Sequence, residues 1–380
     1  MDFHPSEEQQ ILINSTERYV REHYGFEARR AASLTADGFS REHWARFADM
    51  GWLGLSLPEE AGGLGGSVTD VALLIEPLGG ALLAEPLIDT AILAAMLVGA
   101  SMNSNARASL GNAIASGTQI AVLAHLEDGA RSEYDTTVTT RAARTTSGWK
   151  LTGTKRCVFH GASADCWLVT ARLDGIDWDD AHGFGVFVLR SDSPGVSVSD
   201  YRLIDGTHAA DLVLSDATVA ADALLLGPDA APARLQEALD HAVIAATAAA
   251  LGSMETVLSL TSDYIKQRVQ YGRPLGTFQA LQHRMAEMFI ETDQARSALY
   301  HALAAVETGD ATLRRRAVSG AKALVAKAGY FVAGQGIQLH GGIGTTDEYA
   351  VGHHYKAMLI YDKRFGDIDF HVARSAGLPT

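Results

Sequence analysis

The chain has 380 residues, 47% of them hydrophobic and 20% charged, and this ordinary globular composition predicts two or three domains. Its formal net charge of −14 disfavours non-specific binding to nucleic acid or to anionic membranes, so we expect neither as a partner. The two cysteines, Cys157 and Cys166, fit neither a redox pair nor a zinc site, which indicates a reduced, cytoplasmic chain without a metal site.

Residues 1–118 show helical periodicity and form the first predicted domain. Ser6 is a capping signal for the first helix, and Ser40 precedes a further helix. The longest apolar stretch, residues 87–100, contains an aspartate and is too short to span a membrane, so we expect a buried helix and no membrane insertion. The polar, acidic start of the chain also lacks the features of a signal peptide.

Residues 119–228 form a second predicted domain, which is built of β-strands. β-Branched residues recur with period two, and turn residues separate the runs at short spacing, as in an antiparallel sheet. The clearest strands are predicted for residues 136–140, 149–153, 166–170 and 185–189. Residues 229–380 return to helix, with an alanine-rich start whose small side chains favour the close packing of a four-helix bundle. The predicted fold is therefore mainly α with a central β domain.

Two motifs stand out in the last predicted domain. The first runs from Arg268 to His283 and reads RVQYGRPLGTFQALQH, and the second runs from Gln338 to Gly344 and reads QLHGGIG. Glycine runs are common, so the second motif alone is a weak signal. Together, at this separation and after a helical and then a β domain, the two motifs are specific.

On these motifs the chain resembles the acyl-CoA dehydrogenase family over essentially its full length. Residues 348–356 make it most similar to the small subunits of heteromeric members such as pimeloyl-CoA dehydrogenase. The resemblance implies an N-terminal helical domain, an antiparallel barrel-like β domain and a C-terminal four-helix bundle, with FAD held between the last two. It also implies α,β-desaturation of an acyl-CoA thioester, in which a carboxylate abstracts the α-proton while a hydride passes to the flavin.

The resemblance further implies that some cofactor-binding residues are lent across a subunit interface. Arg268 and Gln279 correspond to residues that a neighbouring subunit supplies to the adenine end of FAD. The expected cofactor-binding residues are Arg268, Gln270, Tyr271, Gln279, Gln338, Gly341 and Gly342. A guanidinium suits a diphosphate because it is always charged and forks onto two oxygens, and paired glycines permit close backbone approach. The alternative is that Arg268 only caps a helix and the glycines only turn the chain.

The chain departs from the family at the catalytic carboxylate. The commonest position of the family's glutamate corresponds to Gly352, and the alternative position corresponds to Ala242, so we expect no catalytic residue at either. Glu348 and His353 are weak candidates for a replacement base, because histidine titrates near neutral pH. A second role for Glu348, and a buried, hydrogen-bonded or solvent-exposed histidine, are the simpler explanations.

The residues that would contact the chain's own flavin are also altered. A Trp-Ile-Thr run of the family is replaced by residues 157–159, a Thr-Glu pair by residues 126–127, and a Gly-Thr-x-Gln run by residues 366–369. The last replacement places aspartates near a flavin that carries negative charge, and these would repel it. The residues that would contact a partner's FAD are kept, whereas those that would contact the chain's own flavin are altered. This pattern is typical of a subunit that completes a partner's site.

We therefore interpret the chain as the non-catalytic subunit of an FAD-dependent acyl-CoA dehydrogenase, in a heterotetramer whose second subunit carries the base. The expected partners are that subunit, an acyl-CoA from fatty acid or steroid side-chain β-oxidation, and an electron-transfer flavoprotein or similar acceptor. Two alternatives remain open: a self-sufficient homotetramer that uses an unusual base, and a flavin-free scaffold or binding protein. Fold alone does not decide between them, because function resides in the site.

Overall fold

The computed structural model describes residues 4–175 and 183–378, and its internal contacts divide the chain into two compact units. The first comprises Met1–Ala31, Val68–Leu83 and Val243–Thr380, and the second comprises Ala32–Ser67 and Ala84–Ala242. Each unit is thus assembled from segments that are far apart in the sequence. The finer division at residues 118 and 228 remains a prediction.

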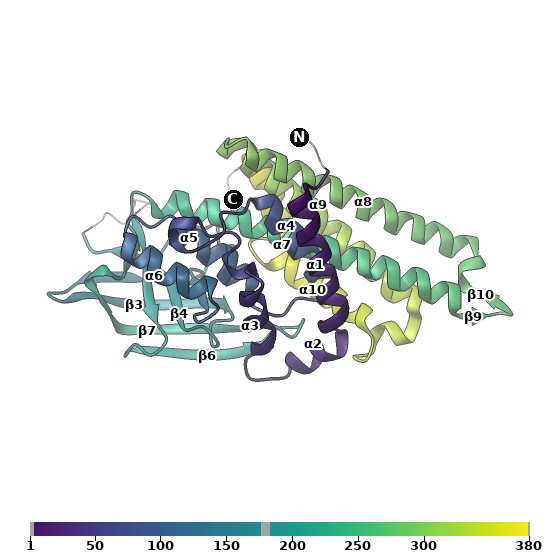
Figure 1. The fold of residues 1–380 in the computed structure, drawn as a ribbon, viewed down its shortest axis with the longest axis horizontal. Helices are drawn as coiled ribbons and strands as arrows, with labels where there is room; N and C mark the ends of the chain where they lie inside the picture. The colour runs from purple at the N-terminus through teal and green to yellow at the C-terminus, as the bar shows by residue number, and fades with distance from the viewer. Residues whose placement is uncertain (1–3, 176–182, 379–380) are drawn as a thin grey trace. The chain divides into compact units, whose positions relative to one another are not determined.

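The first unit is helical (Figure 1). Its helices are α1 (Glu7–His23), α2 (Phe26–Ala32), α4 (Val68–Gly80), most of α7 (Ala231–Gln267), α8 (Gln279–Glu307), α9 (Ala311–His340), α10 (Ala350–Lys363) and α11 (Ile368–Ala376). Glycines let α4 and α7 approach closely: a Cβ added to Gly79 would lie 2.2 Å from the Cα of Ala249, and one added to Gly252 would lie 1.9 Å from the carbonyl oxygen of Glu76. The small residues therefore pack helices together, as predicted.

The second unit contains a mixed sheet of eight strands. The strands are β1 (Ala121–Ala124), β2 (Arg141–Arg144), β3 (Gly148–Phe159), β4 (Cys166–Leu173), β5 (Phe184–Arg190), β6 (Val196–Arg202), β7 (His208–Ala220) and β8 (Leu224–Leu226). They follow the order β6-β7-β3-β2-β4-β5-β8, and β1 pairs with β4. Most pairs are antiparallel as predicted, but β1 and β2 both run parallel to β4. Helices α3 (Arg41–Asp49), α5 (Ala95–Gly99) and α6 (Ser104–Ala115) belong to the same unit.

The strand predicted for residues 136–140 is wrong. This segment forms no strand, because the backbone N–H groups of Thr139 and Thr140 donate to the carboxylate of Glu127, at 2.6 Å and 3.0 Å, instead of to a neighbouring strand. The three other strands fall within β3, β4 and β5. Period-two patterning therefore located strands correctly only where no buried carboxylate competes for the backbone donors.

Local helix signals agree with the structure. Ser6 and Gln9 form a reciprocal capping box, with each backbone N–H bonded to the other side chain at 3.0–3.2 Å, and Ser40 caps α3. The apolar stretch 87–100 is buried, but its first part, Leu87–Ala94, is π-helical before α5 begins. A π-helix is rare and was not indicated by the sequence.

Helix α7 is long and apolar enough to cross a membrane when judged by length and composition alone. In the structure, 67% of its most apolar window is buried against other residues. A core helix of a globular protein has the same composition, so this one helix is weak evidence for a membrane segment.

Candidate functional site

A short hairpin follows α7 and carries the first motif. Strands β9 (Val269–Gln270) and β10 (Arg273–Pro274) pair in antiparallel register, and Figure 1 shows them beyond the ends of α7 and α8. The two turn residues, Tyr271 and Gly272, both have positive φ, at 53° and 78°, as a tight two-residue hairpin requires. The backbone of Arg268 is held at the base of the hairpin, where its carbonyl accepts from the N–H of Leu275 at 2.8 Å. The motif thus forms a defined projection.

Contacts between helices bring the second motif to the same end of the helical unit. The ring of Tyr264 in α7 stacks on that of His340 at the end of α9, with centroids 4.4 Å apart. Arg284 in the second turn of α8 donates to the side chain of Gln335 in α9 at 2.7 Å. The structure therefore gathers all seven residues predicted to bind the cofactor at one end of this unit: Arg268, Gln270, Tyr271, Gln279, Gln338, Gly341 and Gly342.

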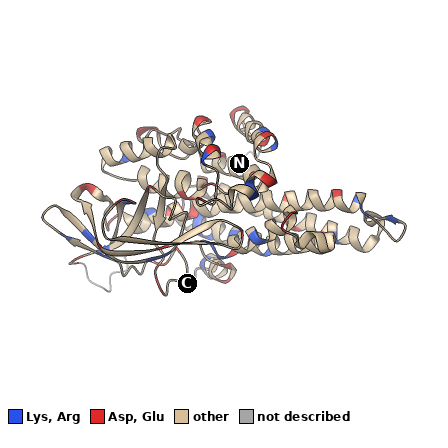
Figure 2. Cartoon of the chain, turned by 90° about the horizontal axis from the view of Figure 1, so that it is seen from below, with Lys and Arg blue, Asp and Glu red and all other residues tan. Residues whose placement is uncertain are grey.

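The side chains in this group are presented to solvent. Arg268, Gln270, Gln279 and Gln338 are exposed, and none of them hydrogen bonds or pairs through its side chain with another residue within 4–175 and 183–378. Tyr271 is 90% exposed. Figure 2 shows basic residues at the hairpin, which contrasts with the net negative charge of the chain. These donors are therefore available to a ligand or to another chain.

The glycines of the second motif are also open. Nothing lies within 4 Å of a Cβ added to Gly341 or to Gly342, and Gly341 has φ 65° and ψ −141°, which favours glycine. An exposed guanidinium, exposed amides and an accessible backbone turn suit the diphosphate and polar groups of a dinucleotide. These residues thus fit the role toward FAD that the resemblance implies.

A side chain at position 352 would crowd the backbone of the turn that precedes α10. Gly352 lies in the first turn of α10, and a Cβ added to it would lie 2.9 Å from the carbonyl oxygen of Gly344. Gly344 is itself buried. A glutamate at this position would therefore require the backbone of the 341–345 turn to move.

The neighbouring histidines are engaged within the fold. His353 Nε2 donates to the carbonyl oxygen of Asp347 at 2.9 Å, and its ring meets Phe26 edge-on at 5.0 Å. His354 is 1% exposed and bonds Ser253 Oγ through Nδ1 at 2.7 Å, and burial lowers its pKa to about 3. Glu348 is exposed to solvent. Both histidines are thus held by hydrogen bonds within the fold, and the exposed Glu348 lacks the dry surroundings that a base for an α-proton needs.

The second family position for the glutamate is also closed. Ala242 is completely buried, and the nearby carboxylate of Asp240 is 1% exposed. Tyr134 OH donates to Asp240 Oδ1 at 2.8 Å. No sequence pattern indicated Tyr134 as a partner, because the two residues are 106 positions apart.

The run that replaces the family's flavin contacts is tied to the sheet. Cys157 lies at an irregularity of β3 with a φ of 48°, and its backbone N–H donates to Asp211 Oδ1 at 3.0 Å. Asp211 also accepts from Arg156 at 2.7 Å and from Tyr201 OH at 3.1 Å. The sequence did not indicate Asp211, whose carboxylate accepts from the backbone N–H of the first residue of this run.

Glu127 is likewise directed inward. Lys155 Nζ donates to Glu127 Oε1 at 2.6 Å, and the two side chains are 0% and 5% exposed. Burial raises the pKa of Glu127, but the Lys155 ammonium and the bonds from Thr139 and Thr140 outweigh burial and hold that pKa near 2. Burial lowers the pKa of Lys155 to about 8. The sequence did not single out Lys155.

The C-terminal aspartate is used as a helix cap. Asp367 Oδ1 accepts from the N–H of Phe370 at 3.0 Å and caps α11. Its other oxygen lies 3.7 Å from Lys363 Nζ. Its negative charge is thus partly offset within the chain.

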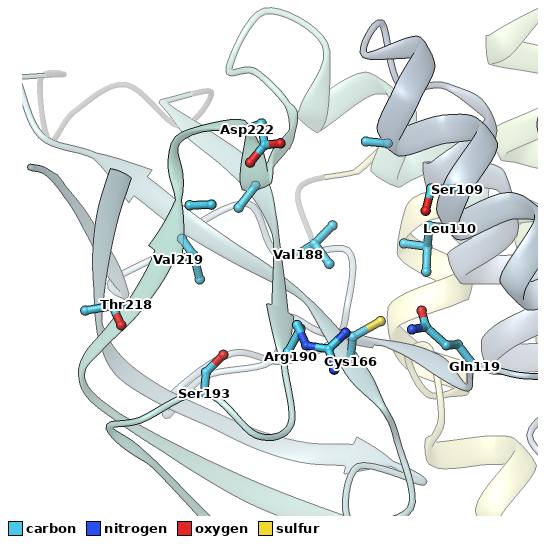
Figure 3. A pocket seen from close by; sticks show the side chains of 13 residues that line it. Ser109, Leu110, Gln119, Cys166, Val188, Arg190, Ser193, Thr218, Val219 and Asp222 are labelled. Carbon is cyan, nitrogen blue, oxygen red and sulfur yellow. The ribbon is translucent and has the colours of Figure 1, made fainter. Parts of the chain in front are cut away.

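A cavity of about 470 Å³ opens in the second unit between α6, β5 and β7 (Figure 3). Figure 3 shows Leu110 and Val188 facing it, with Arg190 beside Cys166. Burial raises the pKa of Cys166 to about 12, so its thiol stays protonated and unreactive. The cavity shares no residue with the predicted site. In the described part of the chain, no group of three or more His, Cys, Asp or Glu side chains is placed to hold a metal.

Comparison with known families gives matches along the chain. Residues 6–117 match the acyl-CoA dehydrogenase N-terminal domain, residues 123–217 the middle domain and residues 233–375 the C-terminal domain. The acyl-CoA dehydrogenases FadE27 and IpdE2 of Mycobacterium tuberculosis are each 30% identical to it, over 364 and 355 residues. These alignments cover 94% and 93% of this chain and 93% and 91% of the relatives.

Two solved structures are similar to this chain over essentially its full length. A variant of the Tcur3481-Tcur3483 steroid ACAD is 29% identical with a TM-score of 0.86, covering 98% of this chain and 97% of that one. The ChsE4-ChsE5 complex from Mycobacterium tuberculosis is 28% identical with a TM-score of 0.88, covering 100% of both chains. Both names describe pairs of proteins.

Proposed function

Because the chain belongs to the acyl-CoA dehydrogenase family, as its motifs predicted, we propose that it is the non-catalytic subunit of a heteromeric, FAD-dependent acyl-CoA dehydrogenase. The observation that carries this proposal is the glycine at position 352, where an added Cβ would lie 2.9 Å from the Gly344 carbonyl oxygen. It is also supported by Arg268, Gln279 and Gln338, which are exposed and whose side chains have no hydrogen-bond or ion-pair partner among the described residues. The chain thus keeps the residues that would bind a partner's FAD, while its own position for the catalytic base holds a glycine.

In this proposal the chain binds and positions a cofactor of its partner. When bound, FAD supplies the acceptor for the hydride that leaves the β-carbon of the acyl-CoA. Arg268 offsets the charge of the diphosphate, while Gln279 and Gln338 donate amide hydrogen bonds to its polar groups. The α-proton is taken by a carboxylate of the partner, since residue 352 in this chain has no side chain to take it.

The assembly that we propose is a heterotetramer with two copies of each subunit. Its support is that two similar solved structures, 28% and 29% identical, carry names that describe pairs of proteins. The name of one includes the words steroid ACAD, which favours an acyl-CoA with a steroid side chain over a simple fatty acyl group. An electron-transfer flavoprotein or similar acceptor, and a cytoplasmic location, complete the proposal.

Two experiments on the isolated chain test the catalytic half of the proposal. Purified alone, the chain is expected to desaturate no acyl-CoA, and the Gly352→Glu variant is expected to gain no activity, because the Cβ of the new side chain would lie 2.9 Å from the Gly344 carbonyl oxygen and displace α10 or the turn. Overpacking at that contact is expected to cost about 1–3 kcal/mol in the free energy of unfolding. Turnover at an ordinary enzyme rate by the unmodified chain would refute the proposal and direct attention to His353 and Glu348 as bases.

A further inference from the structure

The buried glycine of the second motif is held between two helices. A Cβ added to Gly344 would lie 3.0 Å from the carbonyl oxygen of Ile337 and 3.1 Å from the Cβ of His340, both in the last turns of α9. On its other side, the Gly344 carbonyl lies 2.9 Å from the Cβ position of Gly352 in α10. The turn η6 (Gly341–Thr345) is therefore fixed on both sides by close contacts that glycines permit.

The same turn carries the exposed glycines of the candidate site. Gly341 and Gly342 precede Gly344 by three and two residues, and their added Cβ positions have no neighbour within 4 Å. Within the turn, Thr345 Oγ1 donates to the Gly342 carbonyl at 2.9 Å. The backbone position of Gly341 and Gly342 thus depends on the contact between Gly344 and α10, because all three glycines belong to one short turn.

We propose that Gly352 is a positioning residue for the cofactor-facing turn, because its lack of a side chain lets α10 close on the Gly344 carbonyl. This inference rests on the proposed function. It gives Gly352 a structural role in addition to the absence of a catalytic side chain at this position. The Cβ introduced by Gly352→Ala would have to move from 2.9 Å to the ordinary contact distance of 3.4 Å, which displaces the turn or the helix by about 0.5 Å. Binding sites lose function when their groups move by about that distance.

The test compares glycine variants in the complex isolated through a tag on this chain. Gly352→Ala is expected to weaken FAD binding about tenfold, measured by flavin fluorescence on titration of the apo complex. Two matched variants in α9 serve as controls. A Cβ at Gly334 would be 3.8 Å from the Tyr355 ring, an ordinary contact. A Cβ at Gly329 would be 2.5 Å from Met358 Sδ in α10, a contact that the flexible methionine side chain relieves without moving the backbone.

A second variant avoids crowding altogether. Thr345→Val removes the hydrogen bond to the Gly342 carbonyl while leaving the helices intact, and it is expected to weaken FAD binding about threefold. Hydrogen–deuterium exchange of residues 341–346 in the isolated chain gives a readout without flavin, and it is expected to rise in Gly352→Ala and Thr345→Val but not in Gly334→Ala.

The outcomes separate positioning from stability. Weaker FAD binding and faster exchange of residues 341–346 in Gly352→Ala, with unchanged binding in Gly329→Ala and Gly334→Ala, support the inference. Equal loss of binding in Gly352→Ala and Gly329→Ala, or unchanged exchange of residues 341–346 in Gly352→Ala, overturns it. A wild-type complex without flavin overturns the proposed function and this inference together, whereas a flavin-containing complex that tolerates Gly352→Ala overturns the inference alone.

Discussion

The hairpin end of the helical unit and the segments that would serve the chain's own flavin differ in how their polar groups are used. At the hairpin end, Arg268, Gln279 and Gln338 are exposed, and their side chains have no partner among the described residues. In the other segments, Glu127 is paired with a buried lysine and Asp367 caps a helix. The acidic groups of the altered segments are thus engaged by neighbouring residues, while the motif residues are open to a ligand.

This comparison separates two kinds of effect. Substitutions of Glu127 or Asp367 should lower stability without changing FAD binding by the complex, and substitutions of Arg268, Gln279 or Gln338 should do the reverse. A single variant at one of these five residues that changes both quantities would weaken the distinction.

The largest expected effect concerns the buried ion pair of the second unit. Lys155→Met leaves Glu127 buried without its cation and is expected to lower the free energy of unfolding by about 3–5 kcal/mol. Chemical denaturation measures this loss. The double variant Lys155→Met/Glu127→Gln should recover part of it, and a double variant that recovers none would show that the unpaired Glu127 charge is not the source of the loss.

Arg268→Gln should show the opposite behaviour. Loss of a charge-assisted bond to the diphosphate is expected to weaken FAD binding by about 10- to 100-fold, that is about 1.5–3 kcal/mol, with an unchanged melting temperature of the chain. Flavin titration of the complex measures the affinity. Arg46→Gln, which removes only a surface ion pair with Glu42, is the matched control and should leave both quantities unchanged.

The buried His354 is expected to make the stability of the helical unit fall as the pH is lowered. Its folded pKa is lowered from 6.5 to about 3 by burial, so the unfolded chain takes up a proton first as the pH falls. Its contribution to stability is complete above pH 6.5 and is lost as the pH falls toward 3, by about 2 kcal/mol between pH 7 and pH 5. Denaturation at both pH values should show this slope in the wild type and a smaller slope in His354→Gln. An equal slope in both would exclude His354 as its source.

The smallest expected effect is at the buried carboxylate of Asp240. Tyr134→Phe removes one hydrogen bond donor and should lower the free energy of unfolding by about 1 kcal/mol, as measured by denaturant titration. FAD binding by the complex should not change. A loss of flavin in this variant would mean that Tyr134 serves a ligand.

The fold was predictable from the sequence to the extent that local patterns determine it. The caps at Ser6 and Ser40, the period-two strands and the alanine-rich bundle each depend on neighbours in the chain. The parallel pairing of β1 and β2 with β4 was not predictable, because pairing partners are chosen by tertiary packing. The false strand at 136–140 arose because a buried Glu127 took its backbone donors.

The candidate site was predictable only in its motif residues. Arg268, Gln279 and Gln338 were identified because their motifs resemble those of acyl-CoA dehydrogenases, but the motifs did not reveal their exposure. Lys155 and Asp211 were missed because each acts on residues that are tens of positions away. The closure at Gly352 depends on where the backbone of Gly344 passes, which no residue type encodes. The roles of Arg268, Gln279 and Gln338 in binding FAD remain predictions.

The most direct measurement of the central claim is native mass spectrometry of the complex isolated from its host through a tag on this chain, since it reports subunit identity, subunit number and flavin number together. The account predicts a mixed assembly of this chain with a second acyl-CoA dehydrogenase subunit, containing fewer flavins than chains. A homotetramer with one flavin per chain would contradict it.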